Sequence, residues 1–262
     1  MTLQEVLNLI WDQIFVILYL ATWIISVYRY RRFFDTPLKF FPMIIMYTFF
    51  NEILGYFITY SDQFQFFSDS KYTPNNIVIY NIYQVVFFVY IFDVYRKILK
   101  SDQLKKLVFY LIIACVLGYL VNGILVNPLI YQTTYAHIFG SVLMVLISLM
   151  YLREKLNEES SHPLKFNLMF WVTIGLLAFY IPFPLILTFY KIKAVYGIWI
   201  FLKPILVTSI ILMYGFIIFG LLIGKRRAFR WYSKTTYTSL PSWEAFFVIF
   251  AVQPNWNQST VH

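Results

Sequence analysis

The last long apolar stretch of the chain, Gly197 to Gly224, constrains the fold more than any other feature. As a helix it is long enough to cross a hydrocarbon core about 30 Å thick. A basic cluster, Lys225 to Arg227, follows at once and predicts that this end faces the cytoplasm. The stretch holds one charge, Lys203, which is followed directly by Pro204. A cation and a missing backbone N–H therefore fall at the same depth, and Lys203 should need a partner.

Six other stretches of the same kind precede this one. The 262 residues are 60% hydrophobic and only 13% charged, with a mean hydropathy of +0.68. Soluble domains carry about 25% charged residues, so the composition indicates that lipid is the solvent. The stretches long enough to span lie at residues 4–28, 38–60, 77–98, 107–127, 134–152, 166–190 and 197–224. We therefore expect an all-α polytopic membrane protein, a bundle of seven transmembrane helices.

Lys and Arg residues are distributed unevenly over the connections between these stretches. Of the 21, 17 fall on one side of the membrane, three fall on the other, and Lys203 lies within the last stretch. Positive residues collect in cytoplasmic loops. The split predicts an N-terminus outside and a C-terminus in the cytoplasm, and it explains the net charge of +9 without a nucleic-acid partner. We expect a multi-pass protein of a bacterial cytoplasmic (inner) membrane.

Two regions are expected along the chain. Residues 1–230 form the seven-helix bundle, and residues 231–262 form a cytoplasmic tail. The first apolar stretch has no basic segment before it and no small-residue cleavage site, so we expect a retained helix rather than a signal peptide. Within the tail, Trp243 to Val252 is apolar but too short to span. It either lies in the membrane interface or docks on a partner protein or on the bundle.

Polar side chains inside the apolar stretches are the main functional signal, because a charge at a helix centre costs on the order of 2.5 to 3.5 kcal/mol. Counted along each helix, nearly all of them lie in the half of the membrane expected to face outward. We predict an outward-facing polar cavity in which Lys203 pairs with Glu52, Asp12 or both. The candidate ligand-binding residues are Asp12, Glu52, Asn81, Gln84, Asn122, His137 and Lys203. The alternative is that the amides only join helices and that the Lys203 ion pair is purely structural.

The inner halves of the stretches are expected to be nearly free of such groups. Asp93 is the exception, one helical turn from Arg96 and Lys97 near the cytoplasmic boundary. A surface ion pair with these residues accounts for it.

The length, the aromatic-rich helices and two short motifs, Asn81-Ile82-Tyr83 and Phe170-Trp171, carry a family resemblance. In these features residues 1 to about 230 resemble uncharacterised bacterial seven-span inner-membrane proteins, and the resemblance implies no activity. A lysine in the seventh helix is also a feature of the microbial rhodopsins, where it carries retinal. That family is rejected, because its lysine lies near mid-membrane and is served by acidic residues within the third helix. The third stretch of this chain holds only Asp93.

No enzyme is expected from the motifs. The sequence lacks HExxH, GxSxG and Gly-rich phosphate-loop patterns, and its histidines are His137, His162 and His262. The single cysteine, Cys115, gives no metal-ligand set, and we expect no cofactor. We expect a receptor-like protein that binds a small ligand or partner segment from outside and signals to a protein partner on the cytoplasmic side. The alternatives are a small-solute transporter and a non-catalytic subunit of a larger membrane complex.

Overall fold

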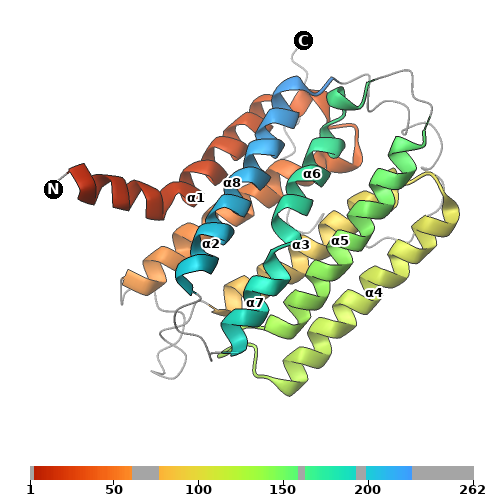
Figure 1. The fold of residues 1–262 in the computed structure, drawn as a ribbon. Coiled ribbons are helices and arrows are strands. Elements are labelled where there is room, and N and C mark those ends of the chain that lie inside the picture. The colour runs from red at the N-terminus through yellow and green to blue at the C-terminus, as the bar shows by residue number, and fades with distance from the viewer. Residues whose placement is uncertain (1–2, 61–76, 159–162, 193–198, 226–262) are drawn as a thin grey trace, which may run out of the picture.

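The computed structural model describes residues 3–60, 77–158, 163–192 and 199–225. Within these ranges it contains helices and no β-strand, which confirms the all-α class. The long helices run side by side along one common direction (Figure 1). They are α1 (Leu3–Tyr28), α2 (Phe41–Tyr60), α3 (Ile77–Ile98), α4 (Asp102–Leu125), α5 (Thr134–Leu156), α6 (Leu168–Tyr180), α7 (Phe183–Ile192) and α8 (Trp199–Ile223). The predicted tail, with its segment Trp243 to Val252, lies outside the described residues.

Within the described residues, five helical segments are long and apolar enough to cross a membrane. They are α3, α4, α5, the segment Leu168–Phe189 that joins α6 and α7, and the segment Leu202–Ile223 of α8. Helix α1 adds a shorter apolar segment, Ile14–Tyr28. Large apolar side chains cover the outside of the bundle, as a lipid-facing surface requires, and Ile124 is 85% exposed. The helices therefore indicate a membrane protein, whereas seven crossings and the orientation of the termini stay predictions.

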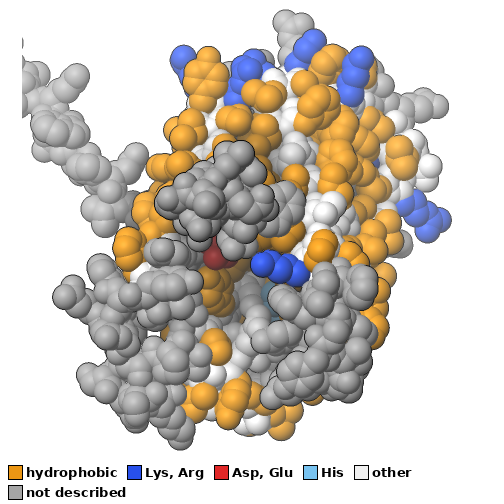
Figure 2. Space-filling model, turned by 60° about the vertical axis from the view of Figure 1, so that its left-hand side comes forward, with side chains coloured by type: hydrophobic (Ala, Val, Ile, Leu, Met, Phe, Trp, Pro, Cys, Tyr) orange, Lys and Arg blue, Asp and Glu red, His pale blue; other side chains and the backbone are white. Residues whose placement is uncertain are grey.

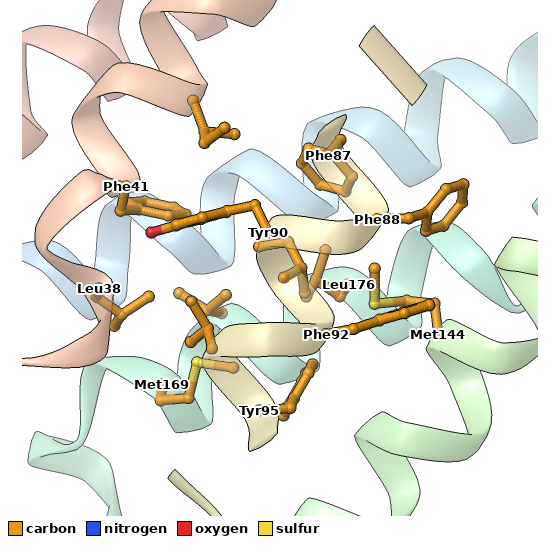
Figure 3. Packing of buried hydrophobic residues seen from close by; sticks show 14 of the residues in the cluster. Leu38, Phe41, Phe87, Phe88, Tyr90, Phe92, Tyr95, Met144, Met169 and Leu176 are labelled. Carbon is orange, nitrogen blue, oxygen red and sulfur yellow. The ribbon is translucent and has the colours of Figure 1, made fainter. Parts of the chain in front are cut away.

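Helix α3 is the central helix of the core. Between Phe87 and Ile98 nearly all of its side chains are buried, whichever way they point from the helix axis. Figure 3 shows Tyr90 lying alongside Phe41 of α2, and Phe92 pointing the other way. A helix that is apolar all round needs neighbours on every side. Helices α2, α4 and α5 provide them.

Helix α4 lies at the edge of the bundle. Its buried residues, Val108, Cys115, Tyr119 and Asn122, are spaced by seven, four and three positions. This spacing places them on one stripe of the helix, which faces α3 and α5. Other apolar side chains of α4, among them Leu117, Leu120 and Ile124, are exposed, where lipid would contact them.

Helices α6 and α8 approach each other closely through two glycines. A Cβ atom on Gly175 would lie 2.7 Å from the backbone oxygen of Met213, and one on Gly220 would lie 2.6 Å from Cβ of Trp171. Both distances are too short for carbon contacts, so no larger residue fits either position without movement of the backbone. Small residues at helix interfaces are the usual means of close packing in membranes.

The segment predicted as the sixth crossing is broken in the middle. Helix α6 ends at Tyr180 and α7 begins at Phe183. Pro182 and Pro184 have no backbone N–H, so the carbonyl groups four residues earlier lose their usual helical donors. The sixth segment is therefore two short helices that meet at a pair of prolines.

The ends at which α1, α3, α5 and α8 finish lie together, and we call this end of the bundle the basic end. Lys and Arg side chains gather along it (Figure 2). Arg32 donates to the carbonyl oxygen of Gly224 at 2.8 Å, which joins the first connection to the end of α8. Glu154 accepts from the backbone N–H groups of Lys100 at 2.7 Å and Ser101 at 3.1 Å. These bonds tie α5 to the turn between α3 and α4.

Glu158 adds a pair of ionic contacts at the basic end. Its carboxylate lies 2.5 Å from Nζ of Lys100 and 2.8 Å from Nζ of Lys155. Partial burial raises the pKa of Glu158, but hydrogen bonds from the two lysines outweigh it and hold that pKa below its ordinary value. Helices α3 and α5 are thereby linked a second time.

Asp93 corrects part of the prediction for the inner half. Its ion pairs with Arg96 at 2.7 Å and Lys97 at 2.9 Å are confirmed. The Asp93 side chain is only 8% exposed, however, so a surface pair was wrong. The short 3-10 helix Pro37–Phe40 packs against α3, a contact that no sequence pattern indicated.

Hydroxyl groups also occupy the half of the bundle next to the basic end. The hydroxyl of Tyr95 lies 2.9 Å from Oγ of Ser148 and donates to Oγ1 of Thr173 at 3.0 Å. All three residues are fully buried. They join α3, α5 and α6, and the expectation of a nearly apolar inner half overlooked them.

Candidate functional site

Asn81 of α3 uses its whole amide to hold the connection between α4 and α5. Its Nδ2 donates to the carbonyl oxygens of Pro128 at 2.7 Å and Tyr131 at 3.0 Å. Its Oδ1 accepts from the backbone N–H and the hydroxyl of Thr133, both at 3.0 Å. Two donors and two acceptors are all that an asparagine amide offers. In this structure Asn81 is an anchor for the connection, and contact with a ligand stays a prediction.

The other two predicted amides also join helices. Gln84 of α3 accepts a hydrogen bond from the Tyr119 hydroxyl of α4 at 3.4 Å. Oδ1 of Asn122 accepts from the backbone N–H of Ala136 at 3.2 Å, in the first turn of α5. Both amides are buried. Their role in packing is observed, and a ligand-binding role is not tested by these contacts.

His137 of α5 lies beside the break between α6 and α7. Its ring centroid is 4.8 Å from that of Phe183 and 5.6 Å from that of Phe88. The side chain is buried, and Nδ1 has no hydrogen-bond partner among the described residues. His137 is therefore a polar group held inside an aromatic contact rather than at the interface.

Lys203 is exposed, near the first turn of α8. No ion pair joins it to Glu52 within the part of the chain that the structure describes. The side chain of Asp12 lies outside the described residues, so that pairing stays a prediction. The N-terminal part of α1 turns away from the other helices (Figure 1).

We call the end away from the basic end the opposite end, and Glu52 lies near the middle of α2, eleven residues after the start of that helix. It is half-buried, and its Oε2 accepts a hydrogen bond from the Tyr80 hydroxyl of α3 at 3.1 Å. Tyrosines of α1, α3 and α8 lie within electrostatic reach of Glu52; those of α1 and α8 are buried and those of α3 are half-buried. We call Glu52 and these tyrosines the Glu52 cluster, which comprises Glu52, Tyr19, Tyr80, Tyr83 and Tyr214.

The tyrosines of the Glu52 cluster differ in their hydrogen bonds. The hydroxyl of Tyr83 lies 2.7 Å from Oγ1 of Thr48 on α2. The rings of Tyr19 and Tyr214 lie 4.8 Å apart with an angle of 60° between their planes. Both side chains are buried, and neither hydroxyl has a hydrogen-bond partner among the described residues. Two polar groups near a carboxylate are therefore open to a further partner.

Figure 2 shows a hollow in the surface of the bundle. Acidic, basic and histidine side chains are visible in it, close to one another in this view. The described residues contain no group of three or more His, Cys, Asp or Glu side chains that could hold a metal ion.

Sequence reasoning identified Glu52 but missed Tyr83 and Tyr214 as its neighbours. Tyr83 lies three residues after Tyr80, so the helical period could have placed both on one side of α3. Tyr214 carries no such signal, because it is a lone tyrosine in an apolar stretch and one of 22 in the chain. Only the packing of α8 against α1 brings it to Tyr19.

The chain matches no protein-family model, no curated protein and no solved structure. The resemblance to uncharacterised seven-span membrane proteins therefore stays a prediction.

Proposed function

We propose that this protein is a receptor-like, non-enzymatic membrane protein that binds a small ligand at the Glu52 cluster from one side only. In this proposal the chain crosses a bacterial cytoplasmic membrane seven times, with the N-terminus outside. The basic end then faces the cytoplasm, as the positive-inside rule requires. The state of the site would pass to a protein partner at that end.

One observation carries the proposal: the half-buried carboxylate of Glu52 is bonded by Tyr80, and the buried hydroxyls of Tyr19 and Tyr214 have no hydrogen-bond partner among the described residues. Buried polar groups normally have partners, so open ones mark a place where a ligand or water can bind. At the basic end, by contrast, the hydroxyls of Tyr95 and Thr173 bond to each other. A passage through the bundle would have to break these bonds.

A small-solute transporter is the second candidate, and the break between α6 and α7 favours it. Discontinuous helices are typical of transporters, where they allow one half of the protein to move against the other. A transporter must expose its site to both sides in turn, whereas the proposed receptor exposes it to one.

Cysteine labelling in cells separates the two candidates and tests the orientation. Tyr80→Cys places a thiol beside Glu52, Ser68→Cys tests the segment between α2 and α3, and Asn157→Cys tests the basic end. The native Cys115 is buried and should not react. A membrane-impermeant thiol reagent should label Ser68→Cys and Tyr80→Cys in intact cells, and Asn157→Cys only in inverted vesicles.

The labelling of Tyr80→Cys in inverted vesicles decides between receptor and transporter. A receptor with one-sided access leaves this thiol unreactive from the cytoplasmic side. Labelling of Tyr80→Cys from both sides would favour the transporter over the receptor. Labelling of Asn157→Cys in intact cells would overturn the orientation.

A further inference from the structure

We propose that the Glu52 cluster binds the ammonium group of an organic cation. This inference rests on the proposed function, since it names the chemical class of the ligand for the same site. It combines the carboxylate of Glu52, the aromatic faces around it and the open hydroxyls of Tyr19 and Tyr214.

The carboxylate of Glu52 needs a positive partner in order to remain charged among helices. A charged group in an apolar surrounding is costly unless another charge compensates it. Among the described residues, the ion pairs of acidic side chains involve Asp93, Asp102 and Glu158, and none involves Glu52. The hydrogen bond from Tyr80 is neutral and compensates only part of the charge. A bound cation completes the compensation.

Lys203 is not the built-in cation of the cluster in this structure, because no ion pair joins it to Glu52 among the described residues. Helix α8 reaches the Glu52 cluster at Tyr214, which is packed against Tyr19. Lys203 lies eleven residues before Tyr214, about 16 Å along the helix axis. In the proposal, the cation that pairs with Glu52 among the tyrosines is therefore the ligand.

Aromatic rings next to a carboxylate are suited to ammonium groups. The face of a tyrosine ring attracts a cation within about 6 Å, and this attraction grows when water is excluded. The Tyr19 and Tyr214 rings stand 60° apart and present two differently oriented surfaces. Their hydroxyl oxygens can also accept hydrogen bonds from N–H groups. An anion would be repelled by Glu52, and a divalent metal would need further oxygen ligands of the acidic kind.

The test compares a cation with a neutral molecule of the same shape. Choline and 3,3-dimethylbutan-1-ol differ in one atom, the charged nitrogen or the neutral carbon at the branch point. The full-length protein in lipid nanodiscs is heated with each at equal concentration, and with tetramethylammonium and methylammonium. We expect at least one of the three cations to raise Tm by about 2 to 4 °C or more, and the neutral alcohol to leave it unchanged.

Variants locate the effect at the cluster. Glu52→Gln should abolish the shift caused by the cation, and Tyr214→Leu should reduce it strongly. Tyr214→Phe keeps the ring and should keep most of the shift, which separates the aromatic face from the hydroxyl. Glu158→Gln removes a carboxylate at the basic end and should leave the shift intact.

Three results would overturn the inference: no shift with any of the three cations, an equal shift with the alcohol, or a full shift in Glu52→Gln. If Glu52→Gln does not fold, the comparison of Tyr214→Leu with Tyr214→Phe decides, because a shift unchanged in both excludes the aromatic site. The labelling of Tyr80→Cys uses no ligand. One-sided access can therefore be confirmed even if no cation binds, and cation binding can be confirmed even if access is not one-sided.

Discussion

The basic end and the opposite end of the bundle satisfy their polar groups in different ways. At the basic end, Glu154 and Glu158 bond to the turn after α3, and Tyr95 bonds to both α5 and α6. At the opposite end the Asn81 amide is saturated. Between the two ends, the hydroxyls of Tyr19, Tyr214 and Tyr90 have no hydrogen-bond partner among the described residues. The basic end is held by its own bonds, whereas the region around Glu52 keeps polar groups without one.

The difference follows from which residues face each other across the helices. Short hydroxyl side chains such as Ser148 and Thr173 reach a neighbouring tyrosine only where helices lie close together. Glycines bring α6 and α8 close at Gly175 and Gly220, in the half that ends at the basic end. The Thr48 hydroxyl of α2 likewise lies 2.7 Å from the Tyr83 hydroxyl of α3, whereas the hydroxyls of Tyr19 and Tyr214 have no hydrogen-bond partner among the described residues.

The largest effect should come from the close contact of α6 with α8. Gly175→Leu would force its side chain against the backbone of Met213, because even a Cβ would lie 2.7 Å from that oxygen. We expect a loss of about 3 kcal/mol in stability, measured by unfolding in detergent micelles. The control is Gly215→Leu on the partner helix α8, where an added Cβ meets nothing within 4 Å. Equal losses in the two variants would show that the close contact does not hold the basic half together.

A smaller effect should come from the anchor at the opposite end. Asn81→Leu removes four hydrogen bonds and strands the backbone N–H of Thr133. We expect a loss of about 2 kcal/mol, confined to the connection between α4 and α5. Hydrogen exchange should accelerate at residues 126–133 while the ends of α3 and α5 at the basic end stay protected. Faster hydrogen exchange at both ends of the bundle would show that loss of the Asn81 bonds also destabilises the basic end.

Tyr95→Phe and Tyr90→Phe compare a hydrogen-bonded hydroxyl with one that has no partner among the described residues, both on α3. The Tyr95 hydroxyl has two partners, so its loss should cost about 1 kcal/mol. The Tyr90 hydroxyl is buried without a partner among the described residues, so Tyr90→Phe should be neutral or stabilising. Thermal unfolding of the two variants side by side measures the difference. A loss in Tyr90→Phe as large as that in Tyr95→Phe would contradict the bonding described for α3.

The smallest effect should come from Glu158 and should depend on pH. Its pKa is lowered in the folded protein, so its contribution is present above the pKa of the unfolded chain, about 4.3, and is lost as pH falls through the folded pKa. Glu158→Gln should cost less than about 1 kcal/mol at pH 7, because the pair is partly exposed. Between pH 5 and pH 3 the wild type should lose this advantage over the variant. A Tm difference between the wild type and Glu158→Gln that grows as the pH falls would contradict a lowered pKa for Glu158.

Most of the helices could be predicted from the sequence, because an apolar run in lipid has little alternative to a helix. The stretch 77–98 became α3 with the same limits. The proline break was visible as Pro182 and Pro184, but periodicity alone treated residues 166–190 as one segment. The intramembrane position of Asn81 was also visible, since amides stand out against apolar neighbours.

The partners of those polar groups could not be predicted. Asn81 bonds to residues about 50 positions later, and nothing local indicates that pairing. Tyr214 reaches Tyr19 across almost the whole chain. Such contacts depend on which helix faces lie together, and in an aromatic-rich bundle most faces look alike in sequence.

The break between α6 and α7 also changes how the bundle responds to force. A continuous helix resists bending along its whole length. Where prolines remove backbone hydrogen bonds, the helix bends more easily, and bending occurs mainly at that position. Helix α8 runs unbroken past that level except at Pro204 near its start, and it stays rigidly packed on α6. Thermal bending of the sixth segment is therefore focused on a single turn, at which Phe183 packs on the ring of His137 from α5.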